Sequence, residues 1–121
     1  MFKTRESIGK WLKKMRIQNY TILENLSVNV DGCVYLDNFS LKKIPIQFNI
    51  IKEDFWCDNN QLESLEGVPR EVGGSFYCYN NQLKSLDYVP QKFKFLISDF
   101  GTFTFEEFKE YKRFRDNLKE F

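Results

Sequence analysis

The sequence predicts an α/β protein in which about three coils of 21 residues stack into a short solenoid with a parallel sheet. Two observations predict this architecture. The middle of the chain repeats itself at a fixed stride, and both ends carry amphipathic segments suited to covering a stack. We expect a single domain over residues 1–121, with 1–33 as the N-terminal helix and hairpin cap, 34–96 as the repeats and 97–121 as the C-terminal cap helix.

The repeat is clearest when residues 55–75 are aligned with residues 76–96. The segments FWCDNNQLESLEGVPREVGGS and FYCYNNQLKSLDYVPQKFKFL are identical at 10 of 21 positions. The same frame extends upstream, and Ile97 and Asp99 are expected to begin a fourth coil downstream. The alternative is a β-meander whose turns are similar by chance. The upstream apolar positions are Val34, Leu36, Leu41, Ile44 and Ile51.

Each repeat has the spacing Φ-x-Φ-x-x-N-x-L-x-x-L, where Φ is apolar, which is the leucine-rich-repeat pattern. Alternate side chains of a strand point to the same face, so Phe55 and Cys57 are expected to face inward. Asn60 and Asn81 follow where the chain turns, and their amides can bond backbone groups that the turn leaves unpaired. In the first repeat Phe39 takes this place, and its ring is expected to fill the inside.

Both ends of the chain look like caps. Ile8, Trp11, Leu12 and Met15 have helical spacing, which predicts an amphipathic helix over residues 4–16. Residues 20–22 and 26–32 alternate like strands and are expected to form a hairpin that leads into the first coil. At the far end the capping box TFEE at 104–107 begins a predicted helix.

An apolar stripe runs along that C-terminal helix, and both terminal stripes are expected to close the core, with a partner-binding groove as the alternative. The stripe consists of Phe105, Phe108, Tyr111, Phe114, Leu118 and Phe121.

The composition argues against an enzyme. The chain has no His, which removes the most common general base and the most common metal ligand. It has no glycine-rich phosphate loop, no HExxH and no nucleophile elbow. Cys57 and Cys78 occupy equivalent inward positions, where thiols are usually inert. We therefore expect no catalytic residue, no cofactor and no metal site. No apolar run is long enough for a membrane span and no signal peptide is evident, so a cytoplasmic location is expected.

The outward strand positions predict a protein-binding surface. Large amphipathic rings beside carboxylates are typical of residues that dominate binding energy. A basic or mixed partner is expected, and the alternative is that the rings only stack to stabilise the sheet. Asn38, Asn59 and Asn80 run beside these positions. The predicted partner-binding residues form two ladders, Tyr35, Trp56 and Tyr77 in the first and Asp37, Asp58 and Tyr79 in the second.

The charges suggest an alternative function. Residues 1–16 carry six basic side chains and one acidic, a net charge of +5, whereas residues 17–103 carry seven basic and eleven acidic, a net charge of −4. A basic N-terminal helix could contact phosphates, so nucleic-acid binding is the alternative to protein binding, although the acidic middle disfavours it. The basic side chains are Lys3, Arg5, Lys10, Lys13, Lys14 and Arg16.

The element FxCxNNQLxSL at 55–65 and 76–86, with IPIQF at 44–48 and KWLKKMRIQNYTI at 10–22, resembles the small leucine-rich-repeat-like proteins encoded by bacteriophages and bacteria. The resemblance covers about residues 8–93. It implies a non-catalytic protein-binding role, with host modulation or counter-defence in the host cytoplasm as the setting. Pairing of two copies through an end or an exposed sheet edge stays open.

Overall fold

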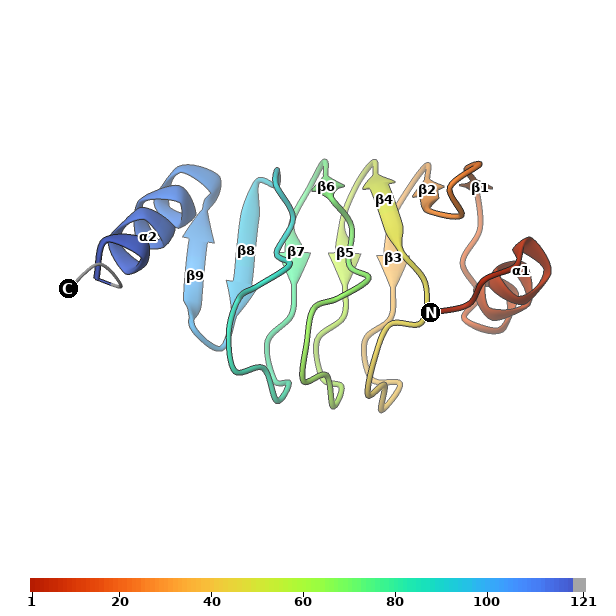
Figure 1. The fold of residues 1–121 in the computed structure, drawn as a ribbon, viewed down its shortest axis with the longest axis horizontal. Coiled ribbons are helices and arrows are strands. Elements are labelled where there is room, and N and C mark those ends of the chain that lie inside the picture. The colour runs from red at the N-terminus through yellow and green to blue at the C-terminus, as the bar shows by residue number, and fades with distance from the viewer. Residues whose placement is uncertain (119–121) are drawn as a thin grey trace.

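The computed structural model describes residues 1–118 and has a mixed α/β fold with two helices and two mixed sheets (Figure 1). Helix α1 (Arg5–Lys14) opens the chain and helix α2 (Phe105–Leu118) closes the described part. Sheet 1 has the order β1 (Tyr20–Ile22), β2 (Val28–Val30), β4 (Phe48–Ile51), β6 (Glu71–Val72). Sheet 2 has the order β3 (Val34–Tyr35), β5 (Phe55–Trp56), β7 (Phe76–Tyr77), β8 (Phe95–Ser98), β9 (Gly101–Thr104).

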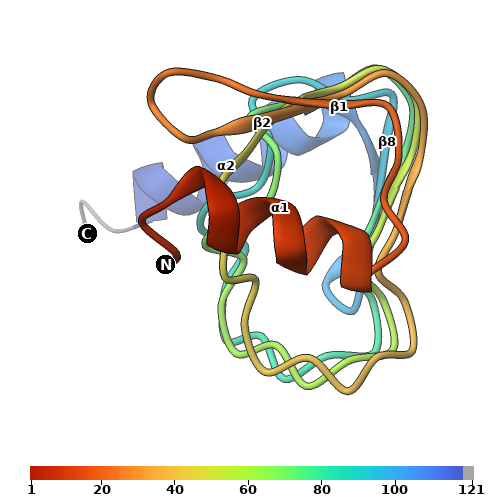
Figure 2. The same ribbon diagram turned by 90° about the vertical axis from the view of Figure 1, so that its right-hand side faces the viewer.

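The register of both sheets follows the 21-residue repeat. In sheet 2, Val34 pairs in parallel with Phe55, and Phe55 with Phe76. In sheet 1, Ile51 pairs in parallel with Val72 at the same stride. The first two repeats thus give one strand to each sheet, whereas the third gives β7 to sheet 2 and meets sheet 1 only through the isolated bridge of Lys92 to Glu71. The view along the stack shows successive repeats superposed (Figure 2). The predicted hairpin also forms, with β1 antiparallel to β2.

The sequence separation between paired residues of β7 and β8 is one residue shorter than the repeat predicts. Phe76 pairs with Leu96 and not with Ile97, so the expectation for Ile97 was wrong by one position. The residue is lost at the corner before the strand, because the isolated bridge between Glu71 and Lys92 still keeps the 21-residue stride. The preceding corner contains Gly-Gly-Ser between Val72 and Phe76, whereas only Lys-Phe separates residue 93 from residue 96.

Aromatic rings fill the space between the two sheets and extend along the stack. The ring centroids of Trp11 and Phe48 are 6.3 Å apart, those of Phe48 and Phe55 5.1 Å, and those of Phe55 and Phe76 5.7 Å. Helix α1 lies across the N-terminal end of the repeats (Figure 2). Its Ile8, Trp11 and Leu12 side chains are buried, so the helix predicted at residues 4–16 covers this end.

The turn asparagines bond the backbone as the sequence predicts. The Asn60 side-chain oxygen accepts hydrogen bonds from the backbone N–H groups of Phe39 and Leu41, at 3.0 and 2.9 Å. The Asn60 amide nitrogen donates to three carbonyl oxygens, those of Leu36, Cys57 and Asp58. Each such amide therefore ties its own turn to the turn of the preceding repeat.

The expectation for Phe39 was wrong, because its ring is 46% exposed and does not fill the inside. The backbone on both sides is left-handed, with φ of 60° at Asn38 and 55° at Ser40. This local path turns the Phe39 side chain outward while its N–H still points at the Asn60 amide.

At the C-terminal end the predicted capping box forms. The Thr104 N–H donates to Glu107 Oε1 at 2.8 Å, and the Glu107 N–H donates to Thr104 Oγ1 at 3.1 Å. The stripe is covered only near the start of the helix, where Phe108 is 8% exposed, whereas Phe114 is 64% exposed. The expectation that the whole stripe closes the core was therefore wrong for Phe114.

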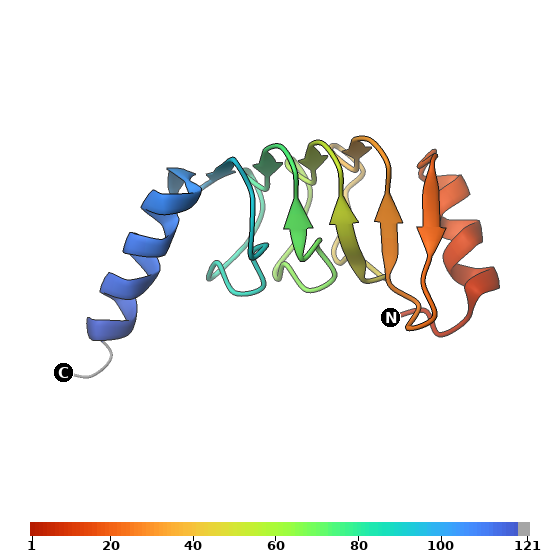
Figure 3. The ribbon, with the colours of Figure 1, turned by 90° about the horizontal axis from the view of Figure 1, so that it is seen from above.

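Helix α2 runs away from the stack beyond the last repeat, which explains this loss of cover (Figure 3). The Leu118 side chain and Phe121, which also belong to the predicted stripe, lie outside the described residues. Neither helix within residues 1–118 combines the length and the apolar character that crossing a bilayer requires.

Candidate functional site

Three aromatic side chains form a continuous row on the outer face of sheet 2, and we call Tyr35, Trp56 and Tyr77 the ring row. Tyr35 pairs directly with Trp56, and Trp56 with Tyr77. The Trp56 and Tyr77 ring centroids are 3.6 Å apart with an interplanar angle of 9°, and those of Tyr35 and Trp56 are 6.3 Å apart at 25°. Tyr35 is 59% exposed and the other two are half-buried. The structure brings these residues together as the sequence predicts.

The second predicted row, Asp37, Asp58 and Tyr79, directly follows the same strands. Asp37 and Tyr79 are half-buried, but Asp58 is only 2% exposed. The expectation that Asp58 faces solvent was therefore wrong. Asp58 is the middle residue of the row, with Asp37 in the preceding repeat and Tyr79 in the following one. The Asn59 side chain donates a hydrogen bond to the Asp58 Oδ2 atom at 2.8 Å.

The buried Asp58 carboxyl has an unusual electrostatic position. Its Oδ1 atom is buried and has no hydrogen-bond partner among the described residues. Burial raises the pKa of Asp58, against the effect of nearby hydrogen-bond donors, and the charge of Asp37 adds to the rise. The charge of Asp58 is in turn the chief reason why the pKa of Tyr79 lies above its usual value.

An asparagine row lies next to the second row and has a backbone conformation that sequence reasoning missed. Asn38, Asn59 and Asn80 have φ of 60°, 54° and 55°. Asparagine tolerates this left-handed conformation better than most residues, so its recurrence at one repeat position was the available signal. The Asn80 amide donates to the Asn59 side-chain oxygen at 2.6 Å, and the Asn38 amide donates to Asp37 Oδ2 at 3.1 Å.

Carboxylates also lie on the opposite side of the ring row, at Glu53 and Asp54. The Cys33 thiol donates to Glu53 Oε2 at 3.4 Å, and the N–H of Ser75 donates to Asp54 Oδ1 at 2.7 Å. The pKa of Tyr35 is raised, chiefly by its interaction with the Cys33 thiol and further by the charges of Asp54 and Glu53. The ring row is thus flanked by acidic side chains on both sides.

The two inward cysteines lie in the core. Cys57 and Cys78 are both fully buried, and burial raises the pKa of each thiol well above its usual value. Both are free thiols. Across residues 1–118, no three His, Cys, Asp or Glu side chains converge as they would around a metal ion.

The six basic side chains of the alternative site are all exposed, but two of them have local partners. The Arg5 guanidinium donates to the carbonyl oxygens of Ile22 and Leu23 at 2.8 and 3.1 Å, which ties α1 to the hairpin. Lys10 forms an ion pair with Glu6 at 3.2 Å on the helix surface. Lys13 and Lys14 lie in the last turn of α1, where a positive charge interacts favourably with the negative end of the helix dipole. Lys3 and Arg16 lie just outside the helix.

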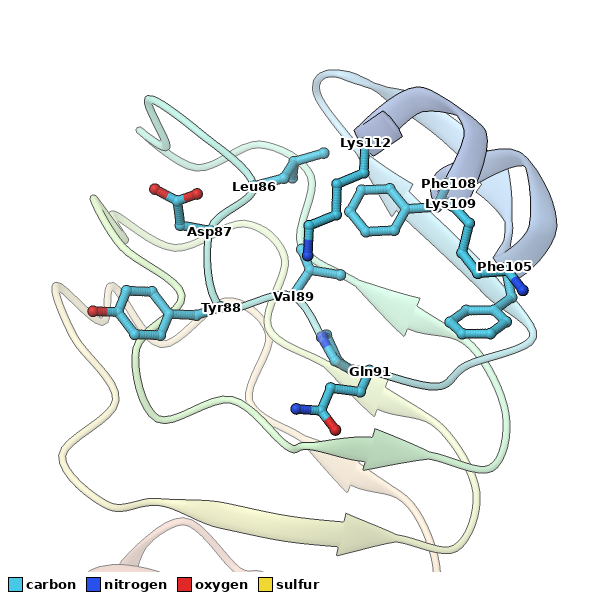
Figure 4. A pocket seen from close by; sticks show the side chains of 10 residues that line it. Leu86, Asp87, Tyr88, Val89, Gln91, Phe105, Phe108, Lys109 and Lys112 are labelled. Atoms are coloured by element: carbon cyan, nitrogen blue, oxygen red, sulfur yellow. The ribbon is translucent and has the colours of Figure 1, made fainter. Parts of the chain in front are cut away.

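A cavity of about 310 Å³ separates the last repeat from the start of α2 (Figure 4). One wall comes from the loop of the last repeat, with Leu86 and Val89, and the other from the helix, with Phe105 and Phe108. The Lys112 side chain extends from the helix toward this space (Figure 4). The cavity is the place where the covered part of the C-terminal stripe meets the repeats.

The structure therefore places the six predicted partner-binding residues in two adjoining rows, one on the outer face of sheet 2 and one just past the ends of its strands, and buries one of them, Asp58. Comparison with known proteins finds no match to a family model, to a curated protein or to a solved structure.

Proposed function

We propose that this chain is a short leucine-rich-repeat-like solenoid that acts as a non-catalytic protein-binding module. The partner contacts the ring row and the adjoining second row on the outer face of sheet 2. The observation that carries the proposal is the alignment of Tyr35, Trp56 and Tyr77 in direct register, with Tyr35 59% exposed. Tyrosine and tryptophan are over-represented among the residues that dominate binding energy.

The arrangement favours binding for two physical reasons. The Trp56 and Tyr77 rings already stack face to face, so these two side chains have few rotamers left to lose when a partner binds. The flanking Asp37, Glu53 and Asp54 side chains make the surroundings of the rings acidic, so a basic or mixed partner is attracted to them. Asp58 contributes charge to this surface but, being buried, little contact area.

Stacking alone does not account for the whole row. It explains Trp56 and Tyr77, whose centroids are 3.6 Å apart, and such a pair contributes about 0.2–1 kcal/mol to the sheet. Tyr35 lies 6.3 Å from Trp56 and keeps most of its surface in solvent. A ring in that position adds little to the sheet but offers a large amphipathic surface to a partner.

The resemblance of the repeats to small phage-encoded proteins adds a biological setting to this proposal. In that setting the chain inhibits or modulates a host or defence protein in the host cytoplasm. The ring row is the surface through which it does so.

The test is affinity purification from host cells with wild-type protein, Trp56→Ala and Tyr88→Ala, followed by mass spectrometry. Tyr88 is a matched control because it is 62% exposed and lies in the loop of the last repeat, away from the ring row. We expect Trp56→Ala to lower the recovery of a specific partner by about tenfold or more, and Tyr88→Ala to retain it. Equal recovery with the wild type and Trp56→Ala would rule out this surface.

Nucleic-acid binding through the basic N-terminal side chains has less support. Arg5 and Lys10 are engaged by the hairpin carbonyls and by Glu6, which leaves a smaller group of charges for phosphates. A gel shift at low salt separates the two functions, since phosphate binding is strongest there. Retardation that is lost in Lys13→Glu, with no partner recovered through Trp56, would favour the nucleic-acid role.

A further inference from the structure

The ring row is unevenly spaced, and its wider interval lies between Tyr35 and Trp56. Neighbouring strands lie about 4.8 Å apart, so evenly placed rings would be separated by about that distance. The Trp56 and Tyr77 centroids are instead 3.6 Å apart, and those of Tyr35 and Trp56 are 6.3 Å apart with planes inclined by 25°. Trp56 therefore leans toward Tyr77 and away from Tyr35. We call the wide interval the Tyr35–Trp56 slot.

A flat group fits such an interval with a small adjustment. Atoms in contact are about 3.5 Å apart, so a planar group between two rings needs them about 7 Å apart. The two centroids are 6.3 Å apart, which falls short of this separation by less than about 1 Å, and a ring that is 59% exposed can turn away from Trp56 by that amount. Both ring centroids then lie within the range of about 6 Å over which an aromatic face attracts a cation.

Negative charge surrounds the slot on both sides. Glu53 and Asp54 lie on one side, close enough to Tyr35 to affect its hydroxyl, and Asp37 and Asp58 follow the strands on the other. The ion pairs formed within residues 1–118 involve none of these four carboxylates.

Asp58 adds an independent observation, because its buried Oδ1 atom accepts no hydrogen bond from the described residues. Because this carboxyl is covered, it adds negative charge beside the slot and no open contact atom. The site thus has two aromatic faces and several carboxylates that no ion pair of the described residues neutralises.

We propose that the Tyr35–Trp56 slot receives the guanidinium group of a partner's arginine side chain, stacked between the two rings and hydrogen-bonded to the flanking carboxylates. This rests on the proposed function, since it names the chemistry that the partner presents to the ring row. Arginine fits better than lysine because its guanidinium is flat and carries five N–H donors that match carboxylates in pairs. A nucleic-acid base would also stack, but its phosphates would meet Glu53, Asp54 and Asp37.

The probe is N-acetyl-L-arginine methylamide, compared with N-acetyl-L-lysine methylamide, which carries the same charge. The indole N–H signal of Trp56 reports binding in two-dimensional NMR and is assigned by its absence from Trp56→Phe. Trp11, which is 9% exposed at the far end of the stack, supplies a second indole signal that reports whether the fold is intact. We expect the arginine probe to shift the Trp56 signal saturably at millimolar concentration, with the lysine probe at least about fivefold weaker.

Variants of the slot sharpen the test. Tyr35→Ala should abolish the response to arginine while the Trp11 signal stays unchanged, and Asp37→Asn should weaken the response by about threefold or more. Tyr88→Ala removes an equally exposed ring elsewhere and should leave the response intact. Equal responses to arginine and lysine, or an undiminished response in Tyr35→Ala, would overturn the assignment.

The outcome separates this inference from the proposed function. If partner recovery depends on Trp56 but the arginine probe shows no preference, the surface binds proteins and only the arginine assignment is wrong. If the arginine probe binds as expected but no partner recovery depends on Trp56, the slot exists and the proposed function is wrong.

Discussion

At the scale of single residues, the amide of Asn60 concentrates more hydrogen bonds than any other feature described above. It accepts two backbone N–H groups and donates to three carbonyl oxygens, and it is 9% exposed. Asn60→Ala leaves these groups buried without partners. We expect the free energy of unfolding to fall by about 3 kcal/mol, measured by urea denaturation.

The neighbouring side chain supplies a control for that measurement. Gln61 is exposed, and Gln61→Ala keeps the backbone bond from the Gln61 N–H to the Leu41 carbonyl. Its effect should stay within about 0.5 kcal/mol. A loss in Asn60→Ala no larger than the loss in Gln61→Ala would contradict the role assigned to the amide.

Asp58 predicts a pH dependence, because its pKa is raised by burial in the folded chain. Below the unfolded value of about 3.9 the carboxyl is protonated in both states, and its contribution to stability is fully present. As the pH rises, the unfolded chain releases the proton first, so this contribution is lost as the pH passes through the folded pKa. Asp58→Asn does not titrate and should therefore gain stability relative to the wild type as the pH rises.

The measurement is the urea midpoint of both proteins from about pH 3 to about pH 8. The other titrating groups are common to the two chains, so the difference isolates Asp58. A difference that does not change over this range would show that the carboxyl titrates alike in the folded and unfolded chains.

The sequence predicts the contacts of a single residue well where the local backbone leaves that side chain one possible role. Asn60 was predicted to bond the turn because its amide both donates and accepts, and it does so. Asp58 was predicted to face solvent because strand alternation points it outward, yet neighbouring repeats and the Asn59 amide cover it. Strand alternation determines which face a side chain points to, but not how far neighbouring side chains cover it. The burial of Asp58 could therefore not be predicted from the sequence.

At the scale of secondary-structure elements, α2 depends on a few aromatic contacts near its start. The Phe108 ring packs against Phe93 at 5.8 Å, Phe103 at 5.9 Å and Tyr111 at 6.0 Å between centroids. Phe108→Ser removes these contacts, at a cost of about 3 kcal/mol. We expect the amides of α2 to lose protection in hydrogen exchange by about a hundredfold, while those of β3 and β5 change little.

Phe114→Ser is the matched control, because Phe114 lies on the same helix but is 64% exposed. Its effect on exchange should be small. Equal loss of protection in α1 and α2 after Phe108→Ser would mean that the two ends are energetically coupled, contrary to a stack in which each repeat contacts only its neighbours.

The elements themselves were predicted unevenly. The capping box placed the start of α2 at the correct residue, because a Thr and a Glu three positions apart satisfy each other's N–H groups. The register of β8 against β7 was wrong by one residue. The missing residue lies in the turn before β8, which lacks the Gly-Gly pair found in the turn of the preceding repeat. The spacing of apolar residues does not indicate how many residues such a turn contains.

At the scale of the whole molecule, the 21-residue identity between two repeats was enough to predict that equivalent residues pair in parallel. It did not predict that the first two repeats also give the strands β4 and β6 to sheet 1. The residues of β6, Glu71 and Val72, are too few to show an alternating pattern. The ring row could be predicted because it follows from the stride alone, whereas its uneven spacing depends on how each ring leans within the row.

The two sheets end in strands that run against the others, and they do so at opposite ends of the stack. Sheet 1 begins with β1, antiparallel to β2, and sheet 2 finishes with β9, antiparallel to β8. In a sheet made only of parallel strands, the exposed strand at each end could pair with the exposed strand of another copy in the same way as the strands inside the sheet pair. Copies could then add head to tail without limit. Here a copy added head to tail would have to continue two sheets at once, and in each sheet a strand of reversed polarity lies at the junction, β9 in sheet 2 and β1 in sheet 1. We therefore expect the reversed edge strands to disfavour growth into a fibre.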